Sequence, residues 1–407
     1  MSENNEDQIP KPTLLAQAEE LLWRKAPRQV RTKMSDEEIE AKYSSKEERI
    51  VTEMNREKLP NFVEALKRPG YMSLRPTYQR RRRWGAERQS RLIESFIMNI
   101  PVPPVFVYET SYNRYEVMDG QQRITAIKDF YEDQLVLTGL ERWPELNEKK
   151  RKQLPSKLQA AIDRRSISVV VLLTESATTD EDALLLKELV FERLNTGGVR
   201  LSQQEVRNCI YQSKLNELLL ELGKLPTFRK TWDLPSYSET ELSAPSDELL
   251  DNRFYSTMQD LEVILRFFAL RHYTHYQRGM QGFLDLYMLR AQCFGDADIA
   301  FLRKQFTDTL NLGAEIFGEK LFRPFDKTNH EWEKKPHVAF SDAVMVGLSA
   351  YLDQSKQLVH KQQDVVVGTM NLFQAHEDGT FTGRGNSKKD VENRINLFKG
   401  LLATVLR

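Results

Sequence analysis

Residues 115–131 carry the clearest structural signal in the chain and read Tyr-Glu-Val-Met-Asp-Gly-Gln-Gln-Arg-Ile-Thr-Ala-Ile-Lys-Asp-Phe-Tyr. The first five form a short run of strand length, and Ile124, Ile127 and Phe130 recur at the spacing of one helix face. The polar run 119–123 therefore lies where a strand passes into a helix. A helix N-terminus gathers unpaired backbone N–H groups and the positive end of the helix dipole, so we predict an anion-binding turn.

The residue types in this turn suit a bound phosphate. Gly120 lets the backbone approach closely, and the guanidinium of Arg123 can grip two phosphate oxygens. Asp119, at the strand end, is placed to orient a metal ion, a ribose hydroxyl or an attacking water. The spacing fits equally well an ordinary turn in which Asp119 caps the helix and Arg123 is solvated, so both interpretations stay open.

Strand and helix patterns continue on both sides of the turn. Residues 86–99 have helical spacing of apolar side chains, and residues 105–109 and 115–119 form a predicted hairpin. Residues 167–173 predict a third strand that is covered on both faces. Further helices are expected over 14–25, 35–58, 182–194 and from Ser202, with Glu205 completing a capping box, to about Leu222 before Gly223.

Strand patterns nearly vanish beyond Pro226, where apolar residues recur at helical spacing over several segments from residue 257 onward. We therefore expect an α+β domain followed by an all-α domain. The expected divisions are a polar helical arm over 1–59, the α+β domain over 60–215, a linker or excursion over 216–256 and a helical domain over 257–407.

Composition limits the class of protein. The chain has 59 Lys and Arg against 59 Asp and Glu, so no overall field draws it onto nucleic acid. No apolar run approaches the roughly 20 residues of a membrane helix, and the acidic start lacks the features of a secretory signal. We therefore expect a cytoplasmic protein with no membrane contact. The two cysteines, Cys209 and Cys293, suit a reducing compartment and are expected to be buried.

Local positive charge gathers between Arg75 and Arg91, where Glu87 is the one opposing carboxylate. Within this run, Gln79 and Arg80 form a polar pair expected to enter the same cleft as the 119–123 turn, with Trp84 anchoring the segment. The candidate contacts to DNA phosphates are Arg81, Arg82, Arg83 and Arg88. A solvated basic loop is the alternative for the whole run.

A third polar segment, Glu192-Arg193-Leu194-Asn195-Thr196-Gly197-Gly198, lies between two predicted helices. Arg193 and Asn195 flank the two glycines, in the kind of loop where hydrogen-bond donors converge on a phosphate or a base. The alternative is that Gly197 and Gly198 only end one helix before the next begins.

Together these segments resemble the N-terminal domain of the GmrSD family of restriction enzymes. The resemblance covers roughly residues 60–215 and rests on Pro76-Thr77-Tyr78-Gln79-Arg80 with Trp84, Leu92-Ile93-Glu94-Ser95-Phe96, Ile100-Pro101-Val102-Pro103-Pro104, Asp119-Gly120-Gln121-Gln122-Arg123 and residues 192–198. It implies a ParB/sulfiredoxin-like fold that binds and hydrolyses an NTP with Mg²⁺. By this resemblance the catalytic residues are Asp119, Gln122 and Arg123, and the nucleotide-binding residues are Gln79, Arg80, Gly120, Gln121, Arg193 and Asn195.

Larger members of that family also carry a His-Asn-His nuclease domain. None of the six histidines here stands in such a context, which argues against DNA cleavage by this chain alone. His272 and His275 have a spacing that can bind metal, but no Cys or carboxylate lies near them in register, so we expect no metal site there.

The leading hypothesis is an NTP-binding and NTP-hydrolysing component of a prokaryotic anti-phage or restriction-type defence system. It would gate the helical domain or a partner effector protein. The alternative is a ParB-like DNA-binding regulatory module that uses nucleotide as a switch, and a phosphodiesterase or nuclease acting through the same pocket ranks last. The expected partners are a nucleotide of unknown identity, DNA, and an effector protein or further copies of the chain.

Overall fold

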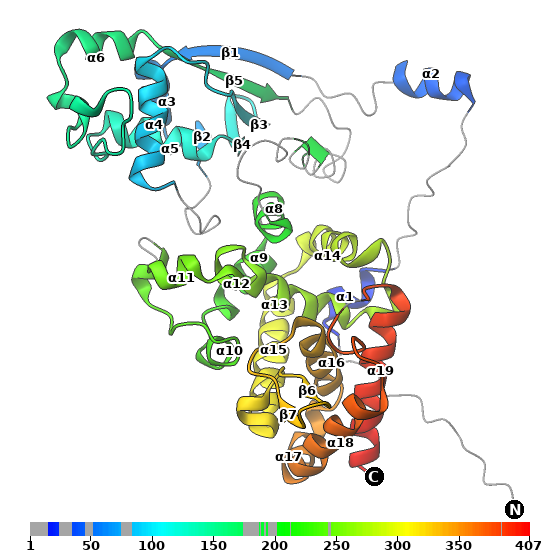
Figure 1. The fold of residues 1–407 in the computed structure, drawn as a ribbon. Coiled ribbons are helices and arrows are strands. Elements are labelled where there is room, and N and C mark those ends of the chain that lie inside the picture. Colours follow the sequence, from blue (N-terminus) through cyan, green and yellow to red (C-terminus); the bar gives the residue numbers. More distant parts are fainter. Residues whose placement is uncertain are drawn as a thin grey trace, which may run out of the picture. The chain divides into compact units, whose positions relative to one another are not determined.

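The computed structural model describes residues 15–23, 35–44, 52–74, 84–173, 187, 189–190, 193, 202–211, 213–242, 246–383 and 385–407. The chain divides into two compact units, one spanning residues 29–210 and the other combining residues 1–28 with 211–407 (Figure 1). We call them the α+β unit and the helical unit. The α+β unit is thus inserted into the sequence of the helical unit.

A mixed five-stranded sheet forms the centre of the α+β unit, in the order β1-β5-β3-β4-β2. β5 pairs antiparallel with β1 and parallel with β3, and β4 pairs antiparallel with β3 and parallel with β2. The strands are β1 (Thr52–Lys58), β2 (Met72–Ser73), β3 (Val105–Ser111), β4 (Arg114–Asp119) and β5 (Ser166–Leu172). Because β3 and β4 are antiparallel, the end of β4 lies beside the start of β3.

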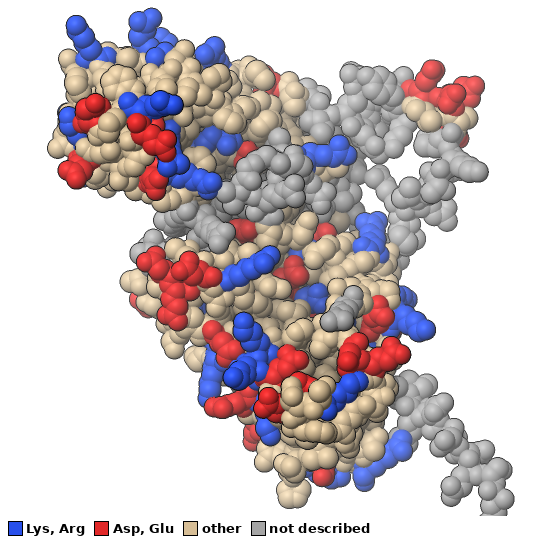
Figure 2. All heavy atoms as spheres, viewed as in Figure 1, with Lys and Arg blue, Asp and Glu red and all other residues tan. Residues whose placement is uncertain are grey.

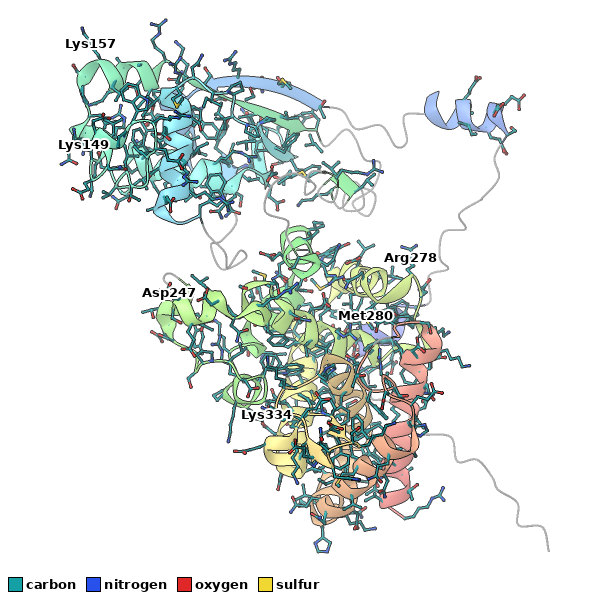
Figure 3. The ribbon with its side chains drawn as sticks, viewed as in Figure 1. Lys149, Lys157, Asp247, Arg278, Met280 and Lys334 are labelled. Carbon is teal, nitrogen blue, oxygen red and sulfur yellow. The ribbon has the colours of Figure 1, made fainter. Side chains whose placement is uncertain are left out.

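Helices lie beside this sheet (Figure 1). They share one hydrophobic core with alternate residues of the central strands. Val107, Val117 and Val169 face this core, because every second side chain of a strand points to the same face. The helices are α3 (Leu59–Leu66), α4 (Ala86–Ile97), α5 (Gln121–Tyr131) and α6 (Ser156–Asp163), with α2 (Asp36–Ser44) and α8 (Gln203–Ile210) elsewhere in the unit. Figure 3 shows side chains filling the layer between sheet and helices, while Lys157 on α6 projects outward.

The structure confirms the predicted α+β class and the hairpin, but it corrects the helix expected over 35–58. That helix ends at Ser44, and residues 52–58 form the edge strand β1. β1 is rich in charged residues and largely exposed, a composition typical of an edge strand. β1 has no hydrophobic pattern of its own. It is a strand because it pairs with the apolar strand β5.

The capping box after residue 201 is confirmed, but its helix is shorter than expected. The Ser202 N–H donates to Glu205 Oε2 at 2.8 Å, and the Glu205 N–H donates to Ser202 Oγ at 3.1 Å. The helix ends at Ile210, and α9 (Lys214–Leu222) begins afresh after Ser213, whose hydroxyl accepts from the Asn216 N–H. A second N-cap therefore divides the expected helix in two.

The second unit is mostly helical, as expected, and it also contains a short hairpin of β6 (Phe325–Asp326) and β7 (Glu331–Trp332). Its longer helices are α13 (Gln259–Leu270), α14 (Gly279–Arg290), α15 (Asp296–Phe317), α16 (Val338–Ser349), α18 (Gln362–Ala375) and α19 (Lys388–Val405). Shorter ones are α1 (Gln17–Leu21), α10 (Pro226–Thr231), α11 (Asp247–Asp251), α12 (Arg253–Ser256) and α17 (Ser355–His360). The segment expected as a linker, 216–256, thus carries helices.

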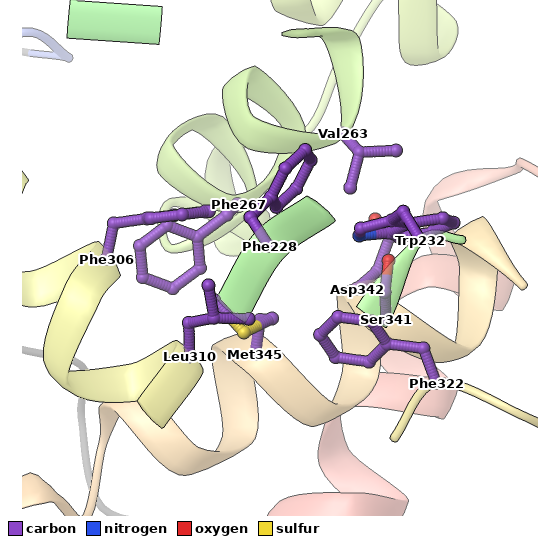
Figure 4. Close-up of a pocket in the computed structure, with 10 residues that line it drawn as sticks. All are labelled: Phe228, Trp232, Val263, Phe267, Phe306, Leu310, Phe322, Ser341, Asp342 and Met345. Atoms are coloured by element: carbon purple, nitrogen blue, oxygen red, sulfur yellow. The ribbon is translucent and has the colours of Figure 1, made fainter. Parts of the chain in front are cut away.

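Aromatic side chains dominate the core of the helical unit (Figure 4). The rings of Phe228, Trp232, Phe267, Phe306 and Phe322 are all buried there. The void between them has a volume of about 10 Å³, which is roughly the space for one water molecule, so it is a packing gap and not a ligand site.

The N-terminal segment belongs to the helical unit through a buried charge network. Glu19 on α1 is fully buried and forms an ion pair with Arg271. The Tyr287 hydroxyl donates to Glu19 Oε1 at 2.7 Å, and His272 Nε2 lies 3.2 Å from the same oxygen. Within the polar helical arm expected over residues 1–59, α1 therefore packs into the helical unit, and His272 does have a carboxylate beside it. That carboxylate comes from the other end of the chain, so spacing within 271–276 could not reveal it.

Cys293 is also corrected, because it is exposed and not buried. It lies in the short 3₁₀ turn Ala291–Cys293 at the end of α14. The Cys209 side chain lies outside the described residues.

Candidate functional site

The turn between β4 and α5 is shaped by Gly120, whose φ of 97° is the left-handed conformation that favours glycine. A Cβ at this position would lie 2.9 Å from Val105 Cγ2 and 3.2 Å from Val105 Cα, at the start of β3. Gly120 is the N-cap of α5 and supplies no side-chain cap, and the first turn of α5 contains no acidic residue. The helix N-terminus thus keeps its positive potential.

Arg123 points inward from the first turn of α5. Its Nη2 donates to Asp119 Oδ2 at 2.8 Å and to the Pro104 carbonyl at 3.0 Å, and the side chain is 14% exposed. Its Nε is buried without a hydrogen-bond partner among the described residues. This geometry differs from the ordinary turn considered above, because Asp119 does not cap the helix and Arg123 is not solvated.

Gln122 connects the turn to the start of α4. Its Oε1 accepts a hydrogen bond of 2.9 Å from the Trp84 N–H, and its side chain is buried. Trp84 also packs against the hydrophobic core. Trp84 thus anchors the beginning of α4, and it does so through its backbone as well as its ring.

The predicted site residues therefore divide into two groups. The structure brings together Asp119, Gly120, Gln121, Gln122 and Arg123 at one turn, and it describes Arg193 as an exposed residue in helical conformation. Gln79, Arg80 and Asn195 lie outside the described residues, so their place at the turn stays a prediction.

The predicted DNA-binding run is described in part. Arg81, Arg82 and Arg83 lie outside the described residues. Arg88 is exposed on α4, with its guanidinium 5.8 Å from the centre of the Trp84 ring. Arg91, one turn further along, pairs with both Glu87 and Glu141. Figure 2 shows Lys and Arg mixed with Asp and Glu on the visible face of the α+β unit.

Sequence reasoning missed an ion pair that joins Lys187 to β4. Lys187 Nζ pairs with Glu116 Oε2, and each of these side chains is 8% exposed. The ammonium also lies 5.5 Å from the centre of the Tyr108 ring on β3. Lys187 and Glu116 are 71 residues apart in the sequence, so no local pattern could predict that they form a buried pair.

A larger cavity of about 410 Å³ lies in the helical unit, beside the β6–β7 hairpin. Its lining includes Asp326, Glu333, Glu377 and Asp378, opposed by Lys327, which itself pairs with Asp378 at 2.9 Å. Excess carboxylates repel phosphate, so this cavity suits a triphosphate less well than the β4–α5 turn does.

Within the part of the chain that the structure describes, no group of three or more His, Cys, Asp and Glu side chains could hold a metal ion. None of the helices in the described ranges is both long enough and apolar enough to cross a membrane.

Comparison with known proteins identifies the region that holds the turn. Residues 59–212 match the family model for the GmrSD restriction endonuclease, N-terminal domain. The match contains the β4–α5 turn, Lys187 and Arg193, and it confirms the resemblance found in the sequence. No curated protein and no solved structure matches the chain.

Proposed function

We propose, from the GmrSD restriction endonuclease N-terminal domain that residues 59–212 form, that this protein is the nucleotide-hydrolysing component of a prokaryotic restriction-type defence system. The observation that carries the proposal is the partly buried ion pair of Asp119 and Arg123 at a helix N-terminus that has no side-chain cap. Hydrolysis would switch the state of the helical unit or of a partner effector protein.

An NTP that enters the turn can take Arg123 as a hydrogen-bond partner. Both hydrogen bonds of the Arg123 guanidinium use Nη2 and its Nε is buried, so Nη1 keeps its donors for a phosphate. In this turn the guanidinium would neutralise the charge that develops on the transferred phosphoryl group. The N–H groups at the start of α5 add positive potential at the same place.

The Asp119 carboxylate is a suitable ligand for the Mg²⁺ ion that accompanies an NTP. Mg²⁺ in nucleotide sites takes one or two protein carboxylates, while phosphate oxygens and waters complete its shell. Asp119 is 39% exposed and uses Oδ2 for Arg123, so Oδ1 would be the oxygen that binds such an ion. When bound, Mg²⁺ would offset phosphate charge.

The test is phosphate release from each NTP with Mg²⁺, measured with and without DNA. We expect Arg123→Ala to lower turnover by about 10²–10³-fold, the usual effect of removing one preorganised charge-stabilising group. Arg123→Lys should recover only part of the loss, because an ammonium lacks the planar fork of donors. Arg91→Ala removes an exposed arginine on α4 that is already paired, and it should leave turnover unchanged.

The same assay separates this proposal from its alternative. Nucleotide binding without phosphate release, lost in Arg123→Ala, would favour a ParB-like regulatory module that uses the nucleotide as a switch. In that case Arg88→Ala should weaken DNA binding and make the affinity less steeply dependent on salt. Wild-type binding and turnover in both Arg123→Ala and Asp119→Asn would exclude the turn as the nucleotide site.

A further inference from the structure

One hydrogen bond joins the N-terminal ends of α4 and α5. The Trp84 N–H, one residue before the N-cap Gly85 of α4, donates to Gln122 Oε1 at 2.9 Å. Gln122 is the second residue of α5. The Trp84 nitrogen and the α5 backbone are thus separated by one glutamine side chain and one hydrogen bond, so the two helix starts lie close together.

The start of α4 offers the same kind of donors as the start of α5. Both helices have a glycine N-cap and no side-chain cap. In α4 the N–H groups of Arg88 and Gln89 bond to the Gly85 carbonyl. The N–H groups of Ala86 and Glu87 have no acceptor within the described ranges, and both residues are exposed. These two donors and the helix dipole are available to an anion.

The side chains in the first turn of α4 do not cancel this positive potential. The Glu87 carboxylate lies beside Gly139 and pairs with Arg91 at 2.8 Å, so it points along the helix and away from the free N–H groups. The Arg88 guanidinium lies 5.8 Å from the centre of the Trp84 ring, and it adds positive charge at the helix start.

The buried amide of Gln122 is the observation that points to a ligand here. The residue is 7% exposed, and its Oε1 is occupied by the Trp84 N–H. Its Nε2 donates to no group in the described part of the chain, yet this atom keeps contact with solvent. A buried amide normally uses its donors as well as its acceptor. An unused donor beside two helix starts therefore indicates a ligand that accepts hydrogen bonds.

We infer that the start of α4 is a second phosphate subsite, which binds one phosphate of a polyphosphate chain while Arg123 and the β4–α5 turn bind another. Gln122 serves both helices, because Oε1 holds the α4 start in place and Nε2 donates to the phosphate bound by the Ala86 and Glu87 N–H groups. The inference rests on the nucleotide site of the proposed function and names the ligand class that this site selects. It selects a di- or triphosphate over a monophosphate, since neighbouring phosphates of one chain suit two subsites so close together.

Binding of inorganic phosphate, pyrophosphate and tripolyphosphate to the full chain, measured by calorimetry, tests the inference. Ala86→Pro removes one N–H group but suits the first position of a helix, and the φ of −64° and ψ of 163° at Gly85 allow a following proline. We expect it to weaken tripolyphosphate binding by about tenfold, the effect of losing one hydrogen bond to a charged group. The affinity for inorganic phosphate should stay unchanged. Ala86→Gly keeps the N–H group and is the matched control.

A second variant tests the amide and does not depend on the folding of Ala86→Pro. In Gln122→Glu the carboxylate keeps an acceptor for the Trp84 N–H, but an oxygen that repels phosphate replaces the Nε2 donor. We expect the affinity for tripolyphosphate to fall by at least about tenfold. Circular dichroism and thermal unfolding of each variant show that the measured protein is folded.

Several outcomes would overturn the second subsite. Ala86→Pro could lose affinity for inorganic phosphate and tripolyphosphate by the same factor, or Ala86→Gly could lose as much as Ala86→Pro. Both Ala86→Pro and Gln122→Glu could bind tripolyphosphate as wild type does, including the case in which they bind only duplex DNA less tightly. In each case the proposed function stands if Arg123→Ala still loses NTP turnover.

The reverse result is also distinguishable. If the variants behave as expected but wild type releases no phosphate from any NTP, the second subsite stands as a binding site and the proposed hydrolysis is wrong. If wild type binds neither an NTP nor tripolyphosphate, the proposed function and this inference fall together.

Discussion

The α+β unit and the helical unit each contain an ion pair between an acidic residue and an arginine, but the two pairs differ in burial. Asp119 and Arg123 are 39% and 14% exposed, whereas Glu19 and Arg271 are both 0% exposed. Glu19 also accepts from the Tyr287 hydroxyl and from the Ala16 N–H. Asp119 has Arg123 as its one hydrogen-bonded partner in the described part of the chain.

This difference separates a structural pair from one that can exchange partners. In the Glu19 cluster several donors bind one buried carboxylate, so a substitution there should change the free energy of unfolding. The Asp119 pair is only partly buried, and the Arg123 guanidinium keeps donors that Asp119 does not use, so a ligand can replace either partner at a lower cost than in the Glu19 cluster. We therefore expect changes at Glu19 to affect stability and changes at Arg123 to affect activity.

The largest stability effect should come from Glu19→Gln. The amide keeps the shape but leaves Arg271 buried without its counter-charge, which typically costs about 3–5 kcal/mol of unfolding free energy. Denaturant unfolding followed by tryptophan fluorescence reports it, because Trp23 stacks on the Phe283 ring in the same unit. Glu20→Gln, at the exposed neighbouring position, should change little. A loss of nucleotide affinity in Glu19→Gln without a loss of stability would contradict the division of roles.

A smaller effect is expected from Gly120→Ala. The left-handed φ and the contact of the new Cβ with Val105 should cost about 1–3 kcal/mol and displace the turn from its ligand-binding geometry. Thermal unfolding and nucleotide affinity measure the two consequences. Gly85→Ala is the matched control, since Gly85 is the N-cap of α4 with an ordinary φ of −64° and open space around its Cβ position. Equal behaviour of the two variants would show that the turn is more tolerant than its geometry indicates.

The smallest effect is a dependence of stability on pH. Burial lowers the pKa of His272 and outweighs the opposing influence of Glu19. The unfolded chain therefore binds a proton more readily than the folded chain, and stability should fall as the pH drops below about 6.5, by at most about 1.4 kcal/mol per pH unit. Urea unfolding at stepped pH should show this slope in wild type and a flatter one in His272→Gln.

Glu19 adds a second step at lower pH. Burial alone would raise its pKa, but the Arg271 charge and the His272 hydrogen bond outweigh burial and lower the pKa to about 2. Its contribution is thus complete above about pH 4.5 and is lost as the pH falls toward 2. His275→Gln should change the slope of stability below pH 6.5 less than His272→Gln does, because His275 is more exposed. A steeper slope in His272→Gln would contradict the pKa direction.

The sequence predicted those elements whose hydrophobic pattern is local. The β3–β4 hairpin, β5, α4 and α5 all follow from apolar periodicity, and the position of residues 119–123 at a strand-to-helix junction follows with them. β1 was missed because its pairing with β5 defines it. Glu19 and Lys187 were missed because their partners, Arg271 and Glu116, lie far away in the sequence. The inward turn of Arg123 depends on the Pro104 carbonyl, which only the folded sheet brings near.

The insertion of the α+β unit has a topological consequence. The chain leaves the helical unit after residue 28 and re-enters it at residue 211, so the inserted unit is fastened at both of its ends. The N-terminal attachment is the five-residue helix α1, which the Glu19–Arg271 ion pair and the stacking of Trp23 on Phe283 hold in the helical unit. If α1 left the helical unit, the α+β unit would remain attached to that unit only through the chain at residues 210–211. No covalent bond would have to break.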